Sequence, residues 1–262
     1  MLRSMYSGIS GMKNFQTKLD VIGNNIANVN TYGFKKGRAV FKDLVSQQIA
    51  GANGPTGGGR GGVNPKQVGL GAQLSAIDTI HTEGSTQTTG RTLDLAISGD
   101  GFFQVNDGVN TYYTRAGNFY MDENGDLINS DGFYMGEAGQ TFNIPTTATS
   151  LSIGTDGTIS YMDGGTLDTS QQIEIAKFPN PEGLRKVGSN LYGVTDNSGA
   201  PETGLPGADG RGTIAPGSLE MSNVDLSEEF TEMIVAQRGF QANTRIITTS
   251  DEILQELMSM KR

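Results

Sequence analysis

The sequence has no cysteine, no tryptophan and one histidine, His81, among its 262 residues. Without cysteine there can be no disulfide, no thiolate nucleophile and no Cys-ligated metal. No apolar run approaches the roughly 20 residues that a membrane-spanning helix requires, and the N-terminal stretch lacks the apolar centre of a cleavable signal peptide. We therefore expect no membrane insertion. If the protein leaves the cytoplasm, we expect it to do so without a cleaved signal peptide.

Catalytic and ligand-binding motifs are also missing. No G-x-S-x-G nucleophile elbow occurs, and the glycine run 57–62 lacks the G-K-[ST] ending of a phosphate loop. Residues 122–132 begin like a calcium loop, but Leu127 stands where that loop needs glycine and Phe133 where it needs glutamate. Such a stretch is typical of a hairpin turn. We predict no catalytic, cofactor-binding or metal-binding residue, no cofactor, and a protein that is not an enzyme.

Charge is distributed unevenly along the chain. The net charge of −9 argues against a nucleic-acid-binding protein, which needs a basic surface. Residues 1–50 hold seven Lys/Arg and two Asp/Glu, whereas residues 219–262 hold four Lys/Arg and eight Asp/Glu. Two terminal segments of opposite charge are suited to lying beside each other.

Both ends of the chain repeat apolar residues every seven positions, which indicates long helices that pack together. A shorter column begins at Leu2 and Ile9. Asp225 or Ser227 supplies an N-cap for the second helix, of about 35 residues. The stripes are broader than one pairing requires, so we expect a further helical partner. The residues of the two main columns, the expected assembly interface together with Ile9, are Met5, Met12, Leu19 and Ile26, and Leu226, Met233, Phe240, Ile247 and Leu254.

Between the ends lie a glycine-rich stretch, 51–65, and a body of short strand-like runs separated by turn residues. The fold class predicted is α+β, with long terminal helices forming a coiled-coil-like domain and a β-rich body inserted between them. The strands expected first in the body are 93–97, 102–105, 111–114 and 118–121. The predicted boundaries are an N-terminal helix at 1–33, a linker at 34–73, the β-rich body at 74–218 and the C-terminal helix at 219–262.

Four asparagines crowd the end of the first helix, although asparagine is a mediocre helix former. Asn30, with Gly33, suits the end of the helix and the turn after it. We hypothesise that Asn24, Asn25 and Asn28 satisfy polar groups of neighbouring elements or subunits, because an interfacial amide without a partner costs about 1–3 kcal/mol. The amides would thereby fix the packing register.

Four blocks of this sequence resemble the flagellar rod and hook axial proteins of bacteria. The blocks are SGISGM (7–12), LDVIGNNIANVNTYGFK (19–35), GDGFFQV…YTRAGNF (99–119) and the run from LEMSNVDL to ILQEL (219–257). The resemblance implies terminal helices packed into the inner wall of a hollow tube, β-rich bodies outside it, and helical polymerisation of many copies. It also implies export through the flagellar type III apparatus without a cleaved signal.

Within that family the sequence favours the hook, a flexible universal joint, over the distal rod, a stiff drive shaft. QRGFQANTRIITT resembles hook proteins of Gram-positive bacteria, and distal rods more often have Ala-Tyr where this chain has Gly239–Phe240. Residues 44–68 instead resemble a stretch found in distal rods and in only some hooks. A hook subunit implies the rod, the hook cap and the hook–filament junction proteins as partners, and an extracellular hook as location. Hook export signals begin with Phe, and the matching positions here are Met5 and Ile9.

The remote alternative is a secreted carbohydrate-binding or hydrolytic protein with helical termini. Tyr112, Tyr113, Phe119 and Tyr120 could form an aromatic binding platform in the body. Alternating aromatics in a hairpin more commonly pack against their own neighbours.

Overall fold

The computed structural model describes residues 2–54 and 61–260, so most of the glycine run 57–62 lies outside the described residues. The chain divides into two compact units. The first contains Met1–Ile26, Gly37–Asp78 and Asp225–Arg262, and the second contains Ala27–Lys36 and Thr79–Val224. The chain therefore passes between the units at four points along its described ranges.

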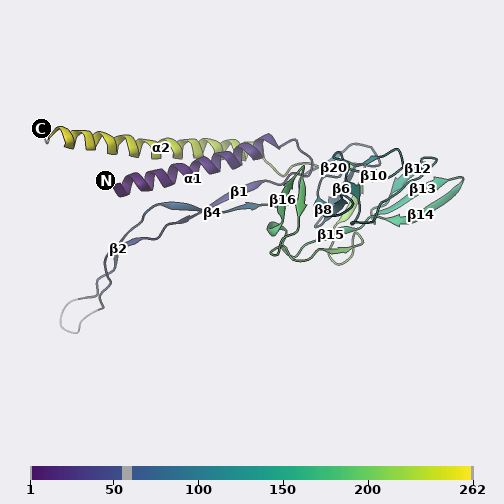
Figure 1. Cartoon of the computed structure of the whole chain (residues 1–262), viewed down its shortest axis with the longest axis horizontal. Helices are drawn as coiled ribbons and strands as arrows, with labels where there is room; N and C mark the ends of the chain where they lie inside the picture. Colours follow the sequence, from purple (N-terminus) through teal and green to yellow (C-terminus); the bar gives the residue numbers. More distant parts are fainter. Residues whose placement is uncertain (1, 55–60, 261–262) are drawn as a thin grey trace. The chain divides into compact units, whose positions relative to one another are not determined.

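The first unit contains two long helices that lie side by side (Figure 1). Helix α1 spans Leu2–Ala27 and helix α2 spans Leu226–Ser259. They run antiparallel, because Met12 contacts Thr244 whereas Lys18, further along α1, pairs with Glu232, nearer the start of α2. The ion pair, at 2.6 Å, joins the basic and acidic ends as their charges predicted. No helix in the described part of the chain is long and apolar enough to cross a membrane.

The start of α2 is as predicted. Asp225 is the N-cap, and its side chain accepts hydrogen bonds from the backbone N–H groups of Ser227 at 2.8 Å and Glu228 at 3.4 Å. These bonds satisfy amides that otherwise have no partner within the helix. Helix α1 ends at Ala27, and a turn containing Gly33, with φ of +68°, follows it.

The region predicted as a linker, 34–73, forms a two-stranded ribbon. Strand β1 (Gly37–Asp43) pairs with β4 (Ala72–Thr79), and β2 (Gln47–Ala50) pairs with β3 (Lys66–Val68). Every residue of β2 and β3 is exposed, so their sequence shows no apolar alternation from which strands could be predicted.

The second unit is built on a nine-stranded sheet in the described part of the chain. Its path runs β16-β17-β8-β7-β11-β10-β9, and β15 joins β7 to β18. A three-stranded sheet, β12-β13-β14, and two strand pairs, β19 with β6 and β20 with β5, complete the unit. The bounds of these strands and of one 3-10 turn are β5 Thr86–Thr88, β6 Leu95–Ser98, β7 Phe102–Asn106, β8 Thr111–Thr114, β9 Tyr120–Met121, β10 Leu127–Ile128, β11 Tyr134–Met135, β12 Thr149–Ile153, β13 Thr158–Asp163, β14 Thr166–Gln172, β15 Ile175–Lys177, η1 Pro181–Gly183, β16 Arg185–Gly188, β17 Leu191–Gly193, β18 Glu202–Gly204, β19 Thr213–Pro216 and β20 Ser218–Glu220.

The predicted strands of the body are present, and the residues around 122–126 form the turn of the β9–β10 hairpin. The main core contains fifteen buried apolar side chains, among them Phe103, Phe119 and Ile159, and they come from the nine-stranded sheet, the three-stranded sheet, the β6–β19 pair and the connections between strands. A smaller core gathers Phe102 and Tyr192 with four other residues. The body is thus a β unit with its own apolar interior.

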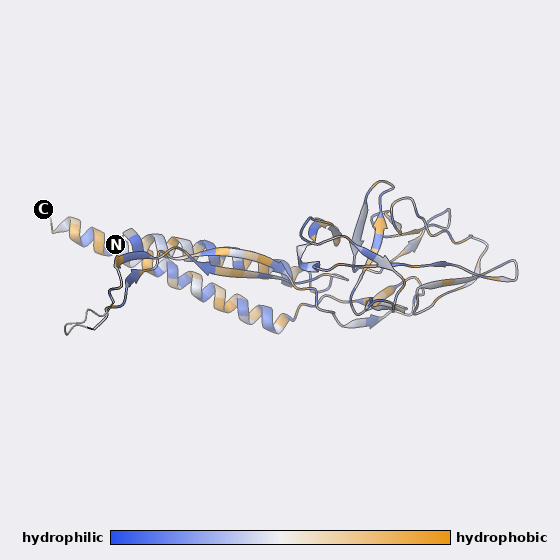
Figure 2. Cartoon of the chain, turned by 90° about the horizontal axis from the view of Figure 1, so that it is seen from below, coloured by the Kyte–Doolittle hydropathy of each residue, from blue (hydrophilic) through white to orange (hydrophobic). Residues whose placement is uncertain are grey.

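The helices and the β-rich body agree with the α+β prediction, but the heptad columns do not close into a buried seam. Among the heptad residues whose side chains the structure describes, none is fully buried. Ile9 and Leu226 are exposed, and the others are half-buried. Hydrophobic and hydrophilic residues alternate along both helices (Figure 2). The physical reason lies in which residues make the closest contacts between the helices.

Candidate assembly site

Helices α1 and α2 approach each other through small residues. A Cβ added to Gly11 would lie 2.8 Å from the side chain of Asn243, and one added to Gly239 would lie 2.5 Å from the ring of Phe15. A Cβ added to Gly8 would lie 3.5 Å from the backbone oxygen of Asn243, an ordinary contact distance. Small residues at these points let the backbones come close. The heptad side chains consequently flank the contact rather than fill it.

Helix α2 therefore keeps an exposed apolar surface. Phe230 is 50% exposed and Ile253 is 47% exposed. A soluble monomer rarely leaves many large apolar side chains on one helix without a partner. We call this set the apolar surface of α2; its members are Phe230, Ile234, Val235, Ile246, Ile253, Leu257 and Met258.

Asn25 joins three elements of the first unit. Its side-chain Nδ2 donates to the carbonyl oxygen of Gly37 at 2.9 Å, and its Oδ1 accepts from the N–H of Gly37 at 2.9 Å. The same Nδ2 donates to Oε2 of the buried Glu229 at 3.2 Å. Helix α1, strand β1 and helix α2 are thus held together by one buried amide.

The other predicted site residues lie in different surroundings. Asn24 is exposed, and Asn28 is half-buried and accepts a hydrogen bond from the hydroxyl of Thr31 in the turn after α1. The half-buried column residues are Met5, Met12, Leu19, Ile26, Met233, Phe240, Ile247 and Leu254. Within one chain, Asn25 is the asparagine whose contacts match the hypothesis most directly.

Replacing Asn25 by alanine should weaken the assembled structure by about 1–3 kcal/mol per subunit, because Gly37 and Glu229 lose a buried partner. The measurement is the temperature at which purified axial structures dissociate, compared with wild type. Gln16→Ala, at an exposed position of α1, is the control and should leave that temperature unchanged. An unchanged temperature for Asn25→Ala would remove the amide from the assembly argument.

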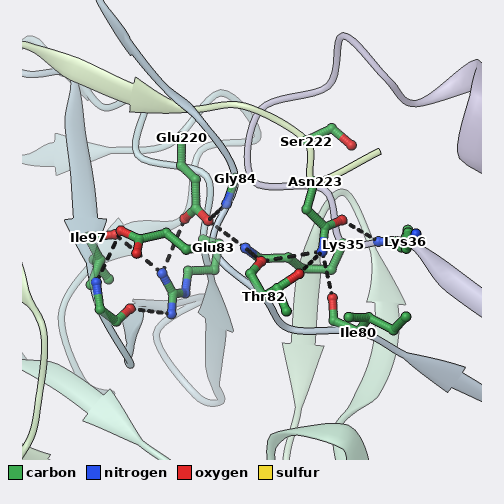
Figure 3. Close-up of polar contacts among 12 residues, drawn as sticks. Lys35, Lys36, Ile80, Thr82, Glu83, Gly84, Ile97, Glu220, Ser222 and Asn223 are labelled. Carbon is green, nitrogen blue, oxygen red and sulfur yellow. Dashed lines mark hydrogen bonds and ion pairs between the residues drawn. The ribbon is translucent and has the colours of Figure 1, made fainter. Parts of the chain in front are cut away.

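A buried polar hub occupies the second unit (Figure 3). It consists of Lys35, Arg115, Glu220 and Asn223, and the first three are almost fully buried. Oε1 of Glu220 accepts from Nζ of Lys35, and Oε2 accepts from Nη1 of Arg115 at 3.2 Å. Nζ of Lys35 also donates to the carbonyl oxygen of Thr82 at 2.7 Å. Burial lowers the pKa of Lys35, and the Glu220 carboxylate opposes that change.

Backbone groups complete the hub. Oδ1 of Asn223 accepts from the N–H of Lys36 at 2.8 Å, and its Nδ2 donates to the carbonyl of Ile80 at 2.9 Å. The N–H of Ile80 in turn donates to the carbonyl of Lys36 at 2.9 Å. The N–H of Gly84 donates to Glu220 at 3.1 Å. Three chain segments distant in sequence meet here.

His81 is half-buried beside the hub. Its ring contacts Phe102 and Tyr192 edge to face, with centroid distances of 5.6 and 5.4 Å. Neither ring nitrogen has a hydrogen-bond partner among the described residues. Burial, followed by the charges of Lys35, Arg115 and Lys186, lowers the pKa of His81 to about 4. The imidazole is therefore neutral near pH 7.

The aromatic side chains proposed as a binding platform do not form one surface. Phe119 is buried against Phe103, and Tyr113 is buried against Phe178. Tyr120 is exposed beneath the guanidinium of Arg91. Among residues 2–54 and 61–260, no group of three or more acidic or histidine side chains is arranged to hold a metal ion.

Three family models match the chain. They are described as "Flagella basal body rod protein" over residues 5–35, "Flagellar hook protein FlgE/F/G D1 domain" over 96–161, and "Flagellar basal body rod FlgEFG protein C-terminal" over 215–260. The flagellar basal-body rod protein FlgG of Bacillus subtilis is 61% identical over 265 residues, covering all of both chains. The chain belongs to the flagellar rod and hook protein family. It is a structural component of the flagellum.

Two relatives from Borreliella burgdorferi show the range of this family. Its basal-body rod protein FlgG is 40% identical over 269 residues, with complete coverage of both chains. Its hook protein FlgE is 32% identical over an alignment of 442 residues, again covering both chains. The rod relative is close to this chain in length, whereas the hook relative is considerably longer.

Sequence reasoning identified the terminal helices but missed the hub. Lys35 and Glu220 are 185 positions apart, and isolated charged residues are normally predicted to be exposed. The available signal was their placement: Lys35 ends one of the four blocks that resemble the family and Glu220 is the second residue of another.

Proposed function

We propose that this protein is a subunit of the distal flagellar rod, which polymerises helically into a stiff hollow shaft that transmits motor torque. The observation that carries the proposal is the ribbon formed by strands β1 to β4, which is paired and anchored where the sequence predicted a linker. Gly37 is hydrogen-bonded to Asn25 at one point of α1. Gly71 lies so close to α1 at another point that an added Cβ would lie 3.4 Å from the Cα of Ser7. A ribbon that is bonded to a helix at one point and packed against it at another resists bending.

Similarity along the whole chain also supports the rod. The 61% identity with the FlgG rod protein extends over both complete chains. The Gly239–Phe240 pair that favoured a hook has a local explanation, because Gly239 faces the ring of Phe15. That glycine is therefore a packing requirement between α1 and α2, whichever shaft the subunit builds.

The apolar surface of α2 is where we place the contact between copies of the chain. Its side chains remain exposed after α1 has packed, and a further helix from a second copy would bury them in a coiled-coil-like arrangement. Before assembly this burial is missing, so we expect the terminal helices of the dilute monomer to be largely unfolded. Circular dichroism of the monomer checks this, since full helix content in dilute solution would contradict it.

Replacing Phe230 and Ile253 by serine should raise the concentration needed for polymerisation while the β-rich body stays folded. Each side chain is about half exposed, so burying the rest is worth about 1 kcal/mol. Losing about 2 kcal/mol per subunit raises the critical concentration for assembly roughly thirtyfold. Sedimentation of polymer from monomer measures it. The control, Gln237→Ser at an exposed polar position of α2, should polymerise normally, and normal assembly of the double variant would contradict the proposed surface.

The hook is the second candidate, supported by the hook-like motifs of the C-terminal segment and by the 32% identity with a FlgE hook protein. As a hook subunit the protein would occupy the extracellular part of the flagellum and contact the rod, the hook cap and the hook–filament junction. In either case the other proposed partners are copies of itself and the export apparatus.

Immunogold electron microscopy distinguishes the two candidates. An epitope inserted between Gly164 and Gly165, a turn where an added Cβ meets nothing within 4 Å, leaves the core untouched. Label on the straight shaft of isolated basal bodies is expected for a rod. Label on the curved segment would establish the hook instead. Unlabelled organelles from motile cells that contain the tagged protein would overturn both.

A further inference from the structure

The polar hub lies next to the points where the chain passes between its two units. Lys35 and Lys36 immediately precede the passage at 36/37, and Ile80 follows the passage at 78/79. Asn223 lies one residue before Val224, the last residue ahead of the passage at 224/225. The remaining passage, at 26/27, begins the short segment that ends at Lys36.

Contacts within the second unit bind these three segments directly to one another. Asn223 bonds to Lys36 and Ile80, as described above, and Lys35 bonds to Glu220 and Thr82. The N–H of Gly33 donates to the carbonyl oxygen of Glu220 at 2.8 Å. The ion pair between Lys35 and Glu220 is fully buried, with both side chains 0% exposed.

We propose that the polar hub is the mechanical root of the body, the place where load on the terminal helices and ribbon enters the β unit. This inference rests on the proposed function, because a subunit of a torque-bearing shaft is loaded through its chain passages. Each passage on its own is a single strand of backbone. Bonded together at a buried ion pair, they must separate at once rather than peel away in turn, and removing one partner leaves an uncompensated buried charge.

Force spectroscopy on the monomer tests this, and the absence of cysteine makes attachment simple. Handles at Gln16→Cys and Gln237→Cys, both exposed, pull the segment after α1 away from the segment before α2. Handles at Val109→Cys and Leu167→Cys, 80% and 66% exposed, pull across the body instead. The two geometries separate load-bearing from general stabilisation.

The variant Glu220→Gln should unfold at least about tenfold faster at constant force when pulled through the terminal handles. Through the body handles we expect a change of less than about threefold. Equal acceleration in both geometries would overturn the inference, since a merely stabilising hub affects both. Arg38→Gln, which removes an ion pair at the surface of the first unit, is the control and should change neither rate.

If Glu220→Gln fails to fold, the milder Asn223→Ala should show the same selectivity for the terminal handles. If this variant accelerates unfolding equally in both geometries, relative to wild type, the inference is likewise overturned. The monomer measurement does not depend on polymerisation. Absence of immunogold label from the straight shaft would therefore remove the proposed function without changing the pulling result. Equal acceleration in both pulling geometries would overturn the inference about the hub and leave the rod assignment intact.

Discussion

Replacing Gly33 by alanine should destabilise the β-rich body by about 2–5 kcal/mol. Gly33 has φ of +68°, a left-handed conformation that costs a residue with a Cβ about 1–2 kcal/mol. The added Cβ would also lie 2.5 Å from the backbone nitrogen of Ala116 and 2.6 Å from the carbonyl carbon of Arg115. Backbone atoms on a strand-anchored segment cannot move aside as a flexible side chain can, so overpacking adds to the conformational cost.

Urea unfolding of the monomer, followed by the fluorescence of its eight tyrosines, measures this change, because the chain has no tryptophan. Gly23→Ala is the matched control. Gly23 lies within α1 with nothing within 4 Å of an added Cβ, and we expect α1 to be largely unfolded in the dilute monomer, so alanine there should leave the unfolding of the body unchanged. If both variants have the wild-type midpoint urea concentration, Gly33 does not pack tightly on the Arg115–Ala116 backbone.

Lowering the pH from about 6.5 to about 4 should remove about 3 kcal/mol from the free energy of unfolding of the body. The pKa of His81 is about 4 in the folded protein, whereas a histidine in an unfolded chain has the ordinary pKa of 6.5. Between these values the unfolded chain binds a proton at His81 and the folded protein does not. The contribution is thus fully present above pH 6.5, falls as the pH drops, and levels off below about 4.

His81→Phe should flatten this part of the pH profile, because phenylalanine fills the site between Phe102 and Tyr192 without titrating. Asp107, Asp156 and Asp168 act in a different window. Hydrogen bonds to their carboxylates hold their pKa values below the usual 3.8, so their contributions persist until the pH falls below that value. An unchanged slope between pH 6.5 and 4 in His81→Phe would show that another group is responsible.

The sequence predicts the helices and the strands of the body because their apolar residues follow the periods of 7 and 2 that burial imposes. It does not predict the ribbon, since every residue of β2 and β3 is exposed and the two strands pair without burying an apolar face. The coiled-coil prediction took the apolar columns as the contact between α1 and α2. The close contacts instead pass through Gly11 and Gly239, whose small size carries no hydrophobic signal.

The candidate site shows a related limit of what the sequence can predict. Asn25 stood out as a polar residue on a helix expected to be packed, and it has buried partners. Lys35 and Glu220 did not stand out, because an isolated lysine or glutamate in a sequence is normally predicted to be exposed. Their pairing depends on the topology of the body, which no local pattern specifies.

The separation of the hub residues also has a consequence for the order of folding. Lys35 and Glu220 are 185 positions apart, so joining them closes a very long loop. The chain loses the entropy of closing this loop before the contact can stabilise the fold. Local hairpins such as β7–β8 and β13–β14 can form on microsecond timescales from their own residues. A chain made from its N-terminus outward cannot close the hub until residue 220 has been added. The body should therefore collapse around its hairpins first and join its two ends last.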